Sequence, residues 1–434
     1  MQLSEFRKGQ ERIRAVFRDN KRVYIYGAGV YAEAFLNWLM GENLKPDFLL
    51  VSDEEKQELK GVTVQKFQPW RQYDGAVIMA LASKYHEEIM ENVVGRFKEI
   101  IMFSDDFFRM LRLSDKLKLR GKNGKWRNCT LEELIKRNRI TKTVILQRGG
   151  GMGDILTLEP LCRALKRKGY QVGLMSNWDC LFSYNGSVDF VAPPFNQFLE
   201  DSALYISVEL AHEVRPLKHM LDAYVEAVSQ YLHGIEIKGE DRIPLYDKAL
   251  IRSHRRDFKK ICINTEASGW QSRIYDLEKM KEVAKYLRAK GYEIYEVGAD
   301  RRNYLGIGQD CFGLALHDSV ELMSKTDLYV GLDNGLMHLA QAIRLPIFVL
   351  FGCTCPLYRI HDWSRARVMW KNVDELPCAG CYHRRRLPCI KTECMYEKCC
   401  CLDWSVEEVI YAFEHLEYGN PPVLQEEMLS PIWP

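Results

Sequence analysis

The sequence lacks any apolar run that approaches the ~20 residues a helix needs to cross a bilayer. It also lacks an apolar segment near its start, where the residues are charged and follow a helical pattern. We therefore expect neither a transmembrane segment nor a signal peptide, and we expect a cytoplasmic protein.

An excess of charge of one sign is absent as well. The chain has 61 Lys and Arg against 59 Asp and Glu, a formal net charge of +2. This balance argues against a protein that binds nucleic acid through its overall charge, so no nucleic-acid partner is expected. No segment repeats at a short fixed period, which excludes a solenoid. The length of 434 residues is too great for one core and predicts several domains.

Cysteine, by contrast, is abundant, with 14 residues. Half of them are scattered along the chain, several within apolar patterns where a thiol packs as a small hydrophobic group: Cys129, Cys162, Cys180, Cys262, Cys311, Cys353 and Cys355. The others gather near the C-terminal end: Cys378, Cys381, Cys389, Cys394, Cys399, Cys400 and Cys401. In a reducing compartment such a cluster indicates metal binding before disulfides.

The cluster at 378–401 begins with a C-x-x-C pair, Cys378 and Cys381, and the later cysteines offer several second pairs for a tetrahedral thiolate site. Iron and zinc fit such a site equally well. We expect a structural role for the ion, because four thiolates leave no open ligand position.

Residues 1–110 predict a small Rossmann-like α/β domain, with strands at 22–26, 48–53, 75–81 and 99–103. GAGVYA (27–32) follows the first strand and opens a helix, which is the geometry that places a pyrophosphate or a ribose on the first turn. The same glycines also serve close packing of strand and helix without a cofactor, so both interpretations stay open.

Residues 111–142 predict a basic linker. Between positions 109 and 142 the chain has 12 Lys or Arg and 3 acidic residues. A solvated connector is the simpler interpretation of such a run, and docking to an anionic acceptor or a membrane surface is the alternative.

The α/β pattern restarts at Thr143. We expect one domain over 143–250 and a second over 251–434, each an α/β sheet with a glycine-rich turn, facing each other across a cleft. The second domain contains the cysteine cluster and ends with a closing helix at 405–418.

GGGMGDILTLEP (149–160) places glycines directly before an acidic residue at a helix start. Gly150, Gly151 and Gly153 let a ligand approach the backbone closely. Asp154 sits where the helix dipole keeps it ionised, so it is a candidate general base at the cleft. A helix cap without substrate contact is the alternative.

DLYVGLDNGLMHLAQAIRLPIFVLFG (327–352) reads as strand, tight turn, helix and strand. Asp333 and Asn334 are both good helix caps, and Gly335 has no side chain to keep an anion from the first backbone amides. His338 lies one turn later on the face that looks toward those amides. The pattern indicates a nucleotide-phosphate site, although an ordinary capped helix between two strands has the same appearance.

Together, these two motifs in this order resemble glycosyltransferase family 9, the heptosyltransferase family with the GT-B fold. The resemblance covers about residues 143–418. It implies inverting transfer from a nucleotide-activated sugar, typically ADP-heptose, without a catalytic metal, and it implies that Asp154 deprotonates the acceptor hydroxyl. It places the residues of the second motif around the donor.

Two further assignments complete the expected donor site. Arg273 stands where the family usually has a lysine that faces the phosphates; arginine keeps the charge and changes the geometry. Asp300 follows a strand that ends at Gly298 and is the candidate partner for the ribose hydroxyls. A surface position for Arg273, and neutralisation of Asp300 by the arginines that follow it, are the alternatives.

The cysteine cluster resembles that of the bacterial autotransporter heptosyltransferases, a branch of the same family with a four-cysteine iron site. By that resemblance the ligands are Cys378, Cys381, Cys389 and Cys401, with Cys394 as the main competitor for the third position. The acceptor would be a protein Ser or Thr, or a surface-glycan sugar. The N-terminal domain does not match these relatives, which leaves a docking or assembly role and a homo-oligomer open.

Two other functions compete with this interpretation. A non-catalytic nucleotide-binding scaffold could use the cysteine cluster and the N-terminal domain for assembly. An oxidoreductase or epimerase could act through GAGVYA, but it would need a Tyr-x-x-x-Lys or Cys–His arrangement nearby, which is not evident in the sequence.

Overall fold

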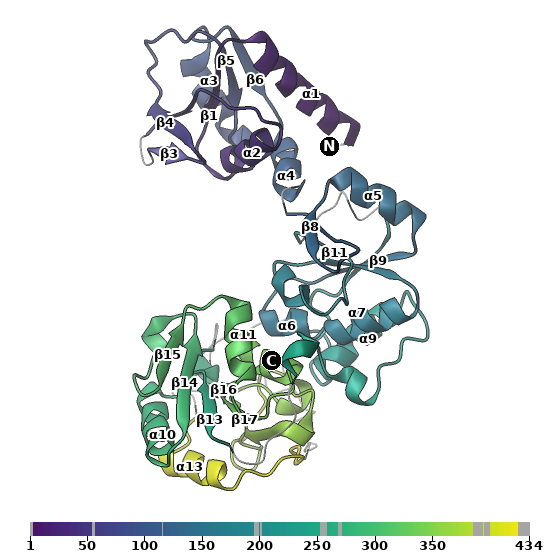
Figure 1. Ribbon diagram of the computed structural model, residues 1–434, viewed down its shortest axis with the longest axis vertical. Coiled ribbons are helices and arrows are strands. Elements are labelled where there is room, and N and C mark those ends of the chain that lie inside the picture. The colour runs from purple at the N-terminus through teal and green to yellow at the C-terminus, as the bar shows by residue number, and fades with distance from the viewer. Residues whose placement is uncertain are drawn as a thin grey trace. The chain divides into compact units, whose positions relative to one another are not determined.

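The computed structural model describes residues 3–53, 57–114, 116–194, 199, 202–251, 258–267, 271–384, 394 and 400–423. It divides into two compact units (Figure 1). Unit 1 comprises Met1–Leu119 and Trp126–Lys136, and unit 2 comprises Arg120–Lys125 and Arg137–Pro434. Among the described residues no helix is both long and apolar enough to cross a membrane.

Unit 1 is built around a sheet with the strand order β3-β4-β2-β1-β5-β6. Its strands are β1 (Val23–Tyr26), β2 (Phe48–Val51), β3 (Glu58–Leu59), β4 (Val62–Lys66), β5 (Ala76–Met79) and β6 (Glu99–Met102). All ladders are parallel except that between β3 and β4. The central strands β1 and β5 are buried at every position, as expected for parallel strands that helices cover on both faces.

The helices of unit 1 are α1 (Leu3–Asp19), α2 (Val30–Gly41), α3 (His86–Val93) and α4 (Asp105–Ser114). The GAGVYA turn joins β1 to α2. Gly27 has φ +122°, and a Cβ there would lie 2.6 Å from the carbonyl oxygen of Ala80. The packing of β1 beside the end of β5 is therefore sufficient reason for glycine at position 27.

The stretch that the sequence predicted as a basic linker contains regular structure. It includes β7 (Lys118–Arg120), β8 (Trp126–Asn128) and α5 (Leu131–Ile140). Arg120 is half-buried, and its guanidinium donates to backbone carbonyls of residues 124, 182, 183 and 188. Part of the positive charge of this stretch is thus engaged in structure.

Unit 2 contains two parallel sheets. The first includes the strand order β12-β9-β10-β11. Its elements are β9 (Thr143–Gln147), β10 (Gln171–Met175), β11 (Phe190–Ala192) and β12 (Leu204–Ser207), with α6 (Met152–Leu156), α7 (Glu159–Arg167) and α9 (Met220–Ser229). The strands β9 and β12 pair in parallel, which brings the chain after Ser207 next to the chain after Gln147.

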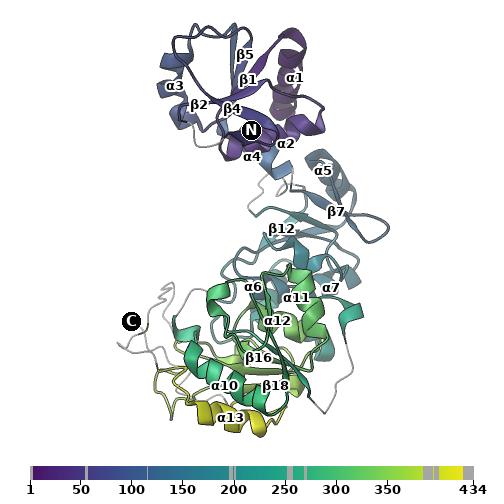
Figure 2. The same cartoon turned by 60° about the vertical axis from the view of Figure 1, so that its left-hand side comes forward.

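The second sheet of unit 2 has the order β15-β14-β13-β16-β17-β18 and is parallel throughout. Its strands are β13 (Lys260–Ile263), β14 (Glu293–Gly298), β15 (Gln309–Phe312), β16 (Leu328–Leu332), β17 (Ile347–Leu350) and β18 (Ala366–Met369). Its helices are α10 (Leu277–Ala289), α11 (Leu316–Ser324), α12 (Gly335–Ala342) and α13 (Val406–Glu414). Figure 2 shows α10 and α13 beside each other at this sheet.

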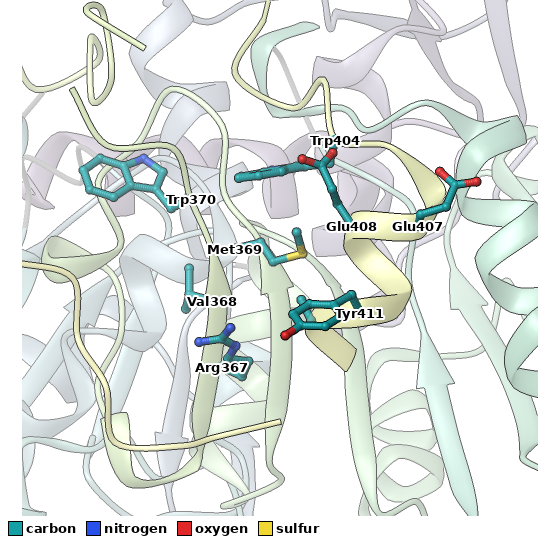
Figure 3. Close-up of a pocket in the computed structure, with 9 residues that line it drawn as sticks. Arg367, Val368, Met369, Trp370, Trp404, Glu407, Glu408 and Tyr411 are labelled. Atoms are coloured by element: carbon teal, nitrogen blue, oxygen red, sulfur yellow. The ribbon is translucent and has the colours of Figure 1, made fainter. Parts of the chain in front are cut away.

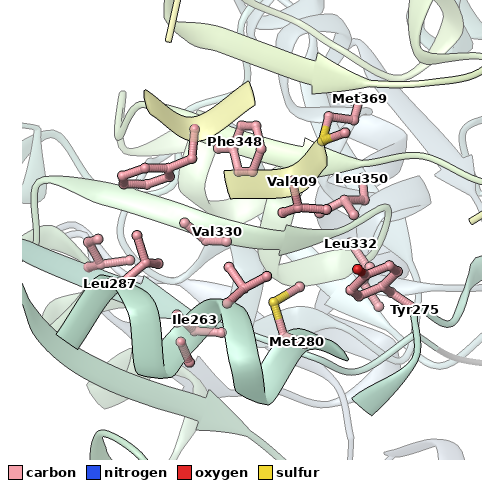
Figure 4. Close-up of a cluster of buried hydrophobic side chains, with 14 of the residues drawn as sticks. Ile263, Tyr275, Met280, Leu287, Val330, Leu332, Phe348, Leu350, Met369 and Val409 are labelled. Carbon is pink, nitrogen blue, oxygen red and sulfur yellow. The ribbon is translucent and has the colours of Figure 1, made fainter. Parts of the chain in front are cut away.

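The core of this sheet explains why the chain returns to it at its C-terminal end. Val409 and Phe413 of α13 are buried in one apolar cluster with Met280 of α10 and Phe348 of β17 (Figure 4). Ser405 caps α13, because its side chain accepts a hydrogen bond from the amide of Glu408. The predicted closing helix thus forms, over a shorter range than expected. The predicted α/β class is confirmed, with two parallel sheets in unit 2 and a smaller α/β sheet in unit 1.

Candidate functional site

A cavity of about 520 Å³ lies in unit 2 where α6 and α12 begin. These helices follow the carboxyl ends of β9 and β16, which is where open α/β sheets bind ligands. The cavity brings together most of the predicted site residues: Gly151, Gly153, Asp154, Arg273, Asp333, Asn334, Gly335 and His338. Residues that the sequence did not predict also line it: Met152, Trp178, His212, Glu213, Thr354, Arg359 and Tyr382.

Glycine is required where the two helix starts meet. A Cβ on Gly153 would lie 2.4 Å from Cδ2 of the His338 ring, and a Cβ on Gly335 would lie 2.4 Å from the terminal methyl of Met152. Gly150 precedes this contact with φ +93°, a conformation that favours glycine. The glycines therefore let α6 and α12 pack against each other at the cavity.

Both carboxylate oxygens of Asp154 have partners. Oδ2 accepts a hydrogen bond from the amide of Gly151 at 3.0 Å, and Oδ1 lies 3.0 Å from Nε2 of His212. Burial by itself would raise the pKa of Asp154, but the His212 hydrogen bond and the nearby charges of Arg148 and Arg359 hold that pKa well below its usual range. Asp154 is therefore an anion that still keeps 21% of its side chain exposed.

A buried guanidinium, that of Arg148, stabilises the Asp154 anion by its positive charge. The side chain of Arg148, which follows β9, is 3% exposed and lies 3.7 Å from the Asp154 carboxylate. Its Nη2 donates to Glu213 at 2.7 Å, and its Nη1 reaches Glu209 at 3.4 Å. Glu209 also accepts a hydrogen bond from the amide of Gly149, so the chain after β12 holds the start of the glycine loop.

Asp333 at the end of β16 is buried, with 3% of its side chain exposed. Its Oδ2 accepts a hydrogen bond from Thr354 Oγ1 at 2.6 Å and lies 3.3 Å from Nη2 of Arg273. The same guanidinium group donates to the backbone carbonyl of Asp333. Burial opposes ionisation, but the charges of Arg273 and Arg359 and the Thr354 bond lower the pKa of Asp333.

Asn334 caps α12. Its Oδ1 accepts hydrogen bonds from the amide of Met337 at 2.9 Å and from the hydroxyl of Tyr329 at 3.1 Å. The cap holds the first turn of the helix at the cavity wall, which Asn334 and Gly335 line.

His338 is buried one turn into α12. Its Nδ1 lies 3.1 Å from Nε2 of His361, whose ring also approaches Thr157, the residue that follows α6. Burial lowers the pKa of His338 to about 4, so the ring is neutral near pH 7. His338 can therefore donate or accept a hydrogen bond at the cavity but does not add a positive charge to it.

Two predicted residues lie elsewhere. Gly150 is in the glycine loop but does not line the cavity, and Asp300 is at the end of β14, where it caps a short 3₁₀ helix and binds the Arg302 side chain. The Arg302 hydrogen bonds lower the pKa of Asp300 to about 2. The positive charge of Arg302 thus compensates the negative charge of the Asp300 carboxylate.

Three of the predicted metal ligands, Cys378, Cys381 and Cys401, are buried in one cluster, and Cys353 lies with them. Cys353 belongs to the group that the sequence suggested to be scattered. The predicted ligand Cys389 lies outside the described residues, and its competitor Cys394 is partly exposed. Across the described ranges, no three His, Cys, Asp or Glu side chains are grouped closely enough to hold a metal ion as they stand. Four buried thiols are ligands that suit iron or zinc. In the described part of the chain, however, they do not lie close enough together to hold the ion.

A second hollow of about 570 Å³ lies between β18 and α13. Met369, Trp404 and Tyr411 surround it, with Glu407 and Glu408 at its rim (Figure 3). Of the predicted site residues that the structure describes, none lines this hollow.

Comparison with known proteins gives a family match for part of the chain. Residues 190–391 match glycosyltransferase family 9 (heptosyltransferase). The chain is 30% identical over 112 residues to the autotransporter heptosyltransferase Aah of Escherichia coli. That alignment covers 23% of this chain and 27% of Aah, so it spans about a quarter of the relative.

Solved structures with a similar fold include two of TibC from Escherichia coli. The iron-containing dodecameric glycosyltransferase TibC of enterotoxigenic strain H10407 is 16% identical, with a TM-score of 0.48, over 63% of this chain and 76% of that chain. TibC in complex with ADP-D-β-D-heptose is 14% identical, with a TM-score of 0.47, over the same shares. The predicted resemblance to the family is thus confirmed for 190–391, whereas Asp154 and its glycine loop precede the matched range.

Proposed function

We propose that this chain, whose residues 190–391 match glycosyltransferase family 9 (heptosyltransferase), transfers a sugar from a nucleotide-activated donor to a hydroxyl acceptor. One observation carries the proposal: a single cavity contains both an ionised carboxylate, Asp154, and the capped N-terminus of α12. The first can act on an acceptor hydroxyl and the second can hold a diphosphate.

The donor diphosphate binds at the start of α12. The first-turn amides at the N-terminus of α12 make this an anion site. Arg273 adds a positive charge beside it, and its Nε is buried and has no hydrogen-bond partner in the described part of the chain. A phosphate oxygen would supply the missing acceptor.

The acceptor hydroxyl binds on the side of α6. Asp154 removes its proton as the oxygen attacks the anomeric carbon, a new C–O bond forms, and the bond from that carbon to the diphosphate oxygen breaks. The nucleoside diphosphate leaves with the electron pair, and the helix amides and Arg273 stabilise the added negative charge. A single displacement of this kind inverts the configuration at the anomeric carbon.

ADP-heptose is the donor that we propose, because the matched family is that of the heptosyltransferases and the curated relative is a heptosyltransferase. A Ser or Thr hydroxyl of a protein is the acceptor that this relationship favours, and a surface-glycan sugar is the second candidate. In this scheme Asp300 does not contact the ribose, since Arg302 already binds its carboxylate.

The cysteine cluster is proposed to hold a structural iron or zinc ion. Cys353, Cys378, Cys381 and Cys401 supply soft ligands and lie buried together. When bound, the ion would crosslink the chain around 378–401 to the end of β17 and would take no part in sugar transfer. Metal analysis of the purified full chain tests this: we expect about one ion per chain, lost in Cys378→Ser and kept in Cys180→Ser.

Calorimetric titration with ADP, UDP and GDP tests the donor. We expect ADP to bind and the Asp333→Ala variant to lose this binding. Binding of UDP or GDP instead would replace the proposed nucleotide.

A transfer assay with ADP-heptose and the Asp154→Asn variant tests the chemistry. We expect transfer to fall by about 100-fold or more while ADP binding remains, because a general base contributes on this order. Equal transfer by both proteins would remove Asp154 from the mechanism. Nucleotide binding without transfer to any acceptor would favour the scaffold.

A further inference from the structure

His212 stands between Asp154 and the charged groups behind it. Its Nε2 lies 3.0 Å from Oδ1 of Asp154 and 3.0 Å from Nη2 of Arg148. Oε1 of Glu213 is a third neighbour of the same nitrogen, at 3.3 Å. The ring meets the buried Tyr224 edge to face, with 5.9 Å between centroids, and this contact keeps its orientation.

One ring nitrogen cannot bond to both of its closest partners in the same way. A guanidinium only donates hydrogen bonds, and a carboxylate only accepts them. When Nε2 has no proton, it can accept a hydrogen bond from Arg148. When Nε2 carries a proton, it can donate to Asp154. The position of one proton therefore decides which neighbour His212 binds.

Protonated Asp154 is not the stable state of this carboxyl group. Its Oδ2 accepts a hydrogen bond from the amide of Gly151, and the charges of Arg148 and Arg359 lie nearby, and both influences favour the anion. A protonated Asp154 beside a neutral imidazole is thus less stable than the ion pair that results when the proton moves across the 3.0 Å contact.

We infer that His212 is a positioning residue that takes up, through Asp154, the proton that the acceptor hydroxyl loses during transfer. The O–H bond of the acceptor breaks as the new bond to the anomeric carbon forms, and the proton passes from the carboxylate to Nε2. The leaving diphosphate departs with its electron pair, and the imidazolium later releases the proton to solvent. This inference rests on the proposed function.

The groups that face His212 come from several elements and act in opposite directions: Arg148, Asp154, Glu213, Tyr224, Arg359 and His383. Burial lowers the pKa of the ring below its usual 6.5, and the hydrogen bond to Asp154 opposes that shift. His212 is therefore neutral near pH 7 and is available to accept a proton.

The test uses the full chain and the His212→Gln variant. We expect kcat to fall by about 100-fold, within the range for general base catalysis, with the Kd of ADP and the KM of the donor within about twofold of the parent. The kcat of the parent should decline as the pH falls below 6.5, because His212 becomes protonated, and the variant should lack this decline. Imidazole should restore part of the activity of His212→Ala.

A matched control is His233→Gln, which changes an exposed histidine outside the cavity and should behave as the parent does. A His212→Gln variant with the parent's kcat and the same acid decline would overturn the inference. If the parent itself transfers no sugar, the proposed function fails and this inference fails with it. If the parent transfers sugar and His212→Gln does so equally well, only the inference fails.

A second measurement covers the case in which the His212 variants do not fold. Nitrogen-15 NMR of the parent should show Nε2 of His212 gaining a proton as the pH falls below 6.5. In Asp154→Asn this protonation should move to a lower pH, because the variant lacks the carboxylate that stabilises the imidazolium. An unchanged titration would overturn the inference.

Discussion

At the scale of single residues, the sequence predicts both Asp333 and Asn334 as caps of the helix that follows them. Each residue type is a good helix cap, but only Asn334 caps α12. Asp333 turns inward, where Arg273 and the Thr354 hydroxyl hold its carboxylate. The expected phosphate-facing charge is thus Arg273, which Asp333 orients.

Arg273→Ala should weaken ADP binding by about 10- to 100-fold, because a hydrogen bond from a charged donor is worth about 1.5–3 kcal/mol. The variant also leaves the buried Asp333 without its cation. Calorimetric titration checks this, with Arg109→Ala as a control, since Arg109 is 65% exposed on α4. Equal affinity in both variants would mean that Arg273 does not face the phosphates.

His219 gives a prediction about stability. Burial lowers its pKa to about 4, so between pH 6.5 and 4 the unfolded chain binds the proton that the folded chain does not. Stability therefore falls as the pH falls through this window, and His219 contributes about 1 kcal/mol per pH unit to that slope.

His219→Asn should flatten the slope by this amount. Asparagine can still cap α9, where the His219 side chain now accepts a hydrogen bond from the amide of Leu221, but it binds no proton. The loss of the contact with the Ile360 carbonyl adds a cost that does not depend on pH. Denaturant unfolding between pH 4 and 7 measures the slope, and an unchanged slope would contradict the prediction.

At the scale of elements, the sequence predicts the parts of the site that are contiguous in the chain. The apolar run at 328–332 forms β16, the turn after it caps α12, and the glycine motif leads from β9 into α6. Each of these features depends on neighbours within about ten residues, where residue propensities and spacing decide the structure.

The partners of Asp154 could not be predicted in this way. His212 reaches Asp154 because β12 pairs with β9, with Ser207 opposite Gln147, and strand order is not written in a local pattern. Cys353 joins the cysteine cluster for a similar reason, since it follows β17 while the rest come from 378–401. Parallel pairing between distant segments is the information that one sequence does not show.

At the contact between α6 and α12, substitutions of different glycines should lower the free energy of unfolding by different amounts. Gly153→Ala should lower the free energy of unfolding by about 1–3 kcal/mol, because the new methyl meets the His338 ring, which packing holds in place. Gly335→Ala should cost less, since its methyl meets the flexible end of Met152.

Gly41→Ala is the control, because nothing lies within 4 Å of the new methyl in α2. It should leave stability equal or slightly higher, as alanine favours a helix. Thermal unfolding ranks the three variants. A Gly153→Ala protein as stable as Gly41→Ala would show that the two helices can separate freely.

At the scale of the whole molecule, each unit has its own core. The aromatic cluster of unit 1 includes Tyr24, Phe67 and Phe97, and all of its described members belong to unit 1. The proposed nucleotide site lies entirely within unit 2. Ligand binding should therefore stabilise the units unequally.

Calorimetric unfolding of the full chain should show two transitions, of which ADP raises only that of unit 2. At 100 times its Kd, ADP should add about 2.7 kcal/mol to the free energy of unfolding of that unit. The same scan with NAD is the control, and a shift of the unit 1 transition by NAD would identify GAGVYA as a working site. A common shift of both transitions by ADP would contradict the separation.

Cys353 and Thr354 are adjacent in the chain, and they face different chemistry. The thiol lies among the buried cysteines, and the hydroxyl holds the Asp333 carboxylate at 2.6 Å. Loss of the proposed metal, or oxidation of these thiols, would displace Cys353, and only one peptide bond separates Cys353 from Thr354 at the proposed donor end of the cavity. Nucleotide affinity is therefore the property in which ageing or oxidation of the protein should appear first, ahead of any loss of fold.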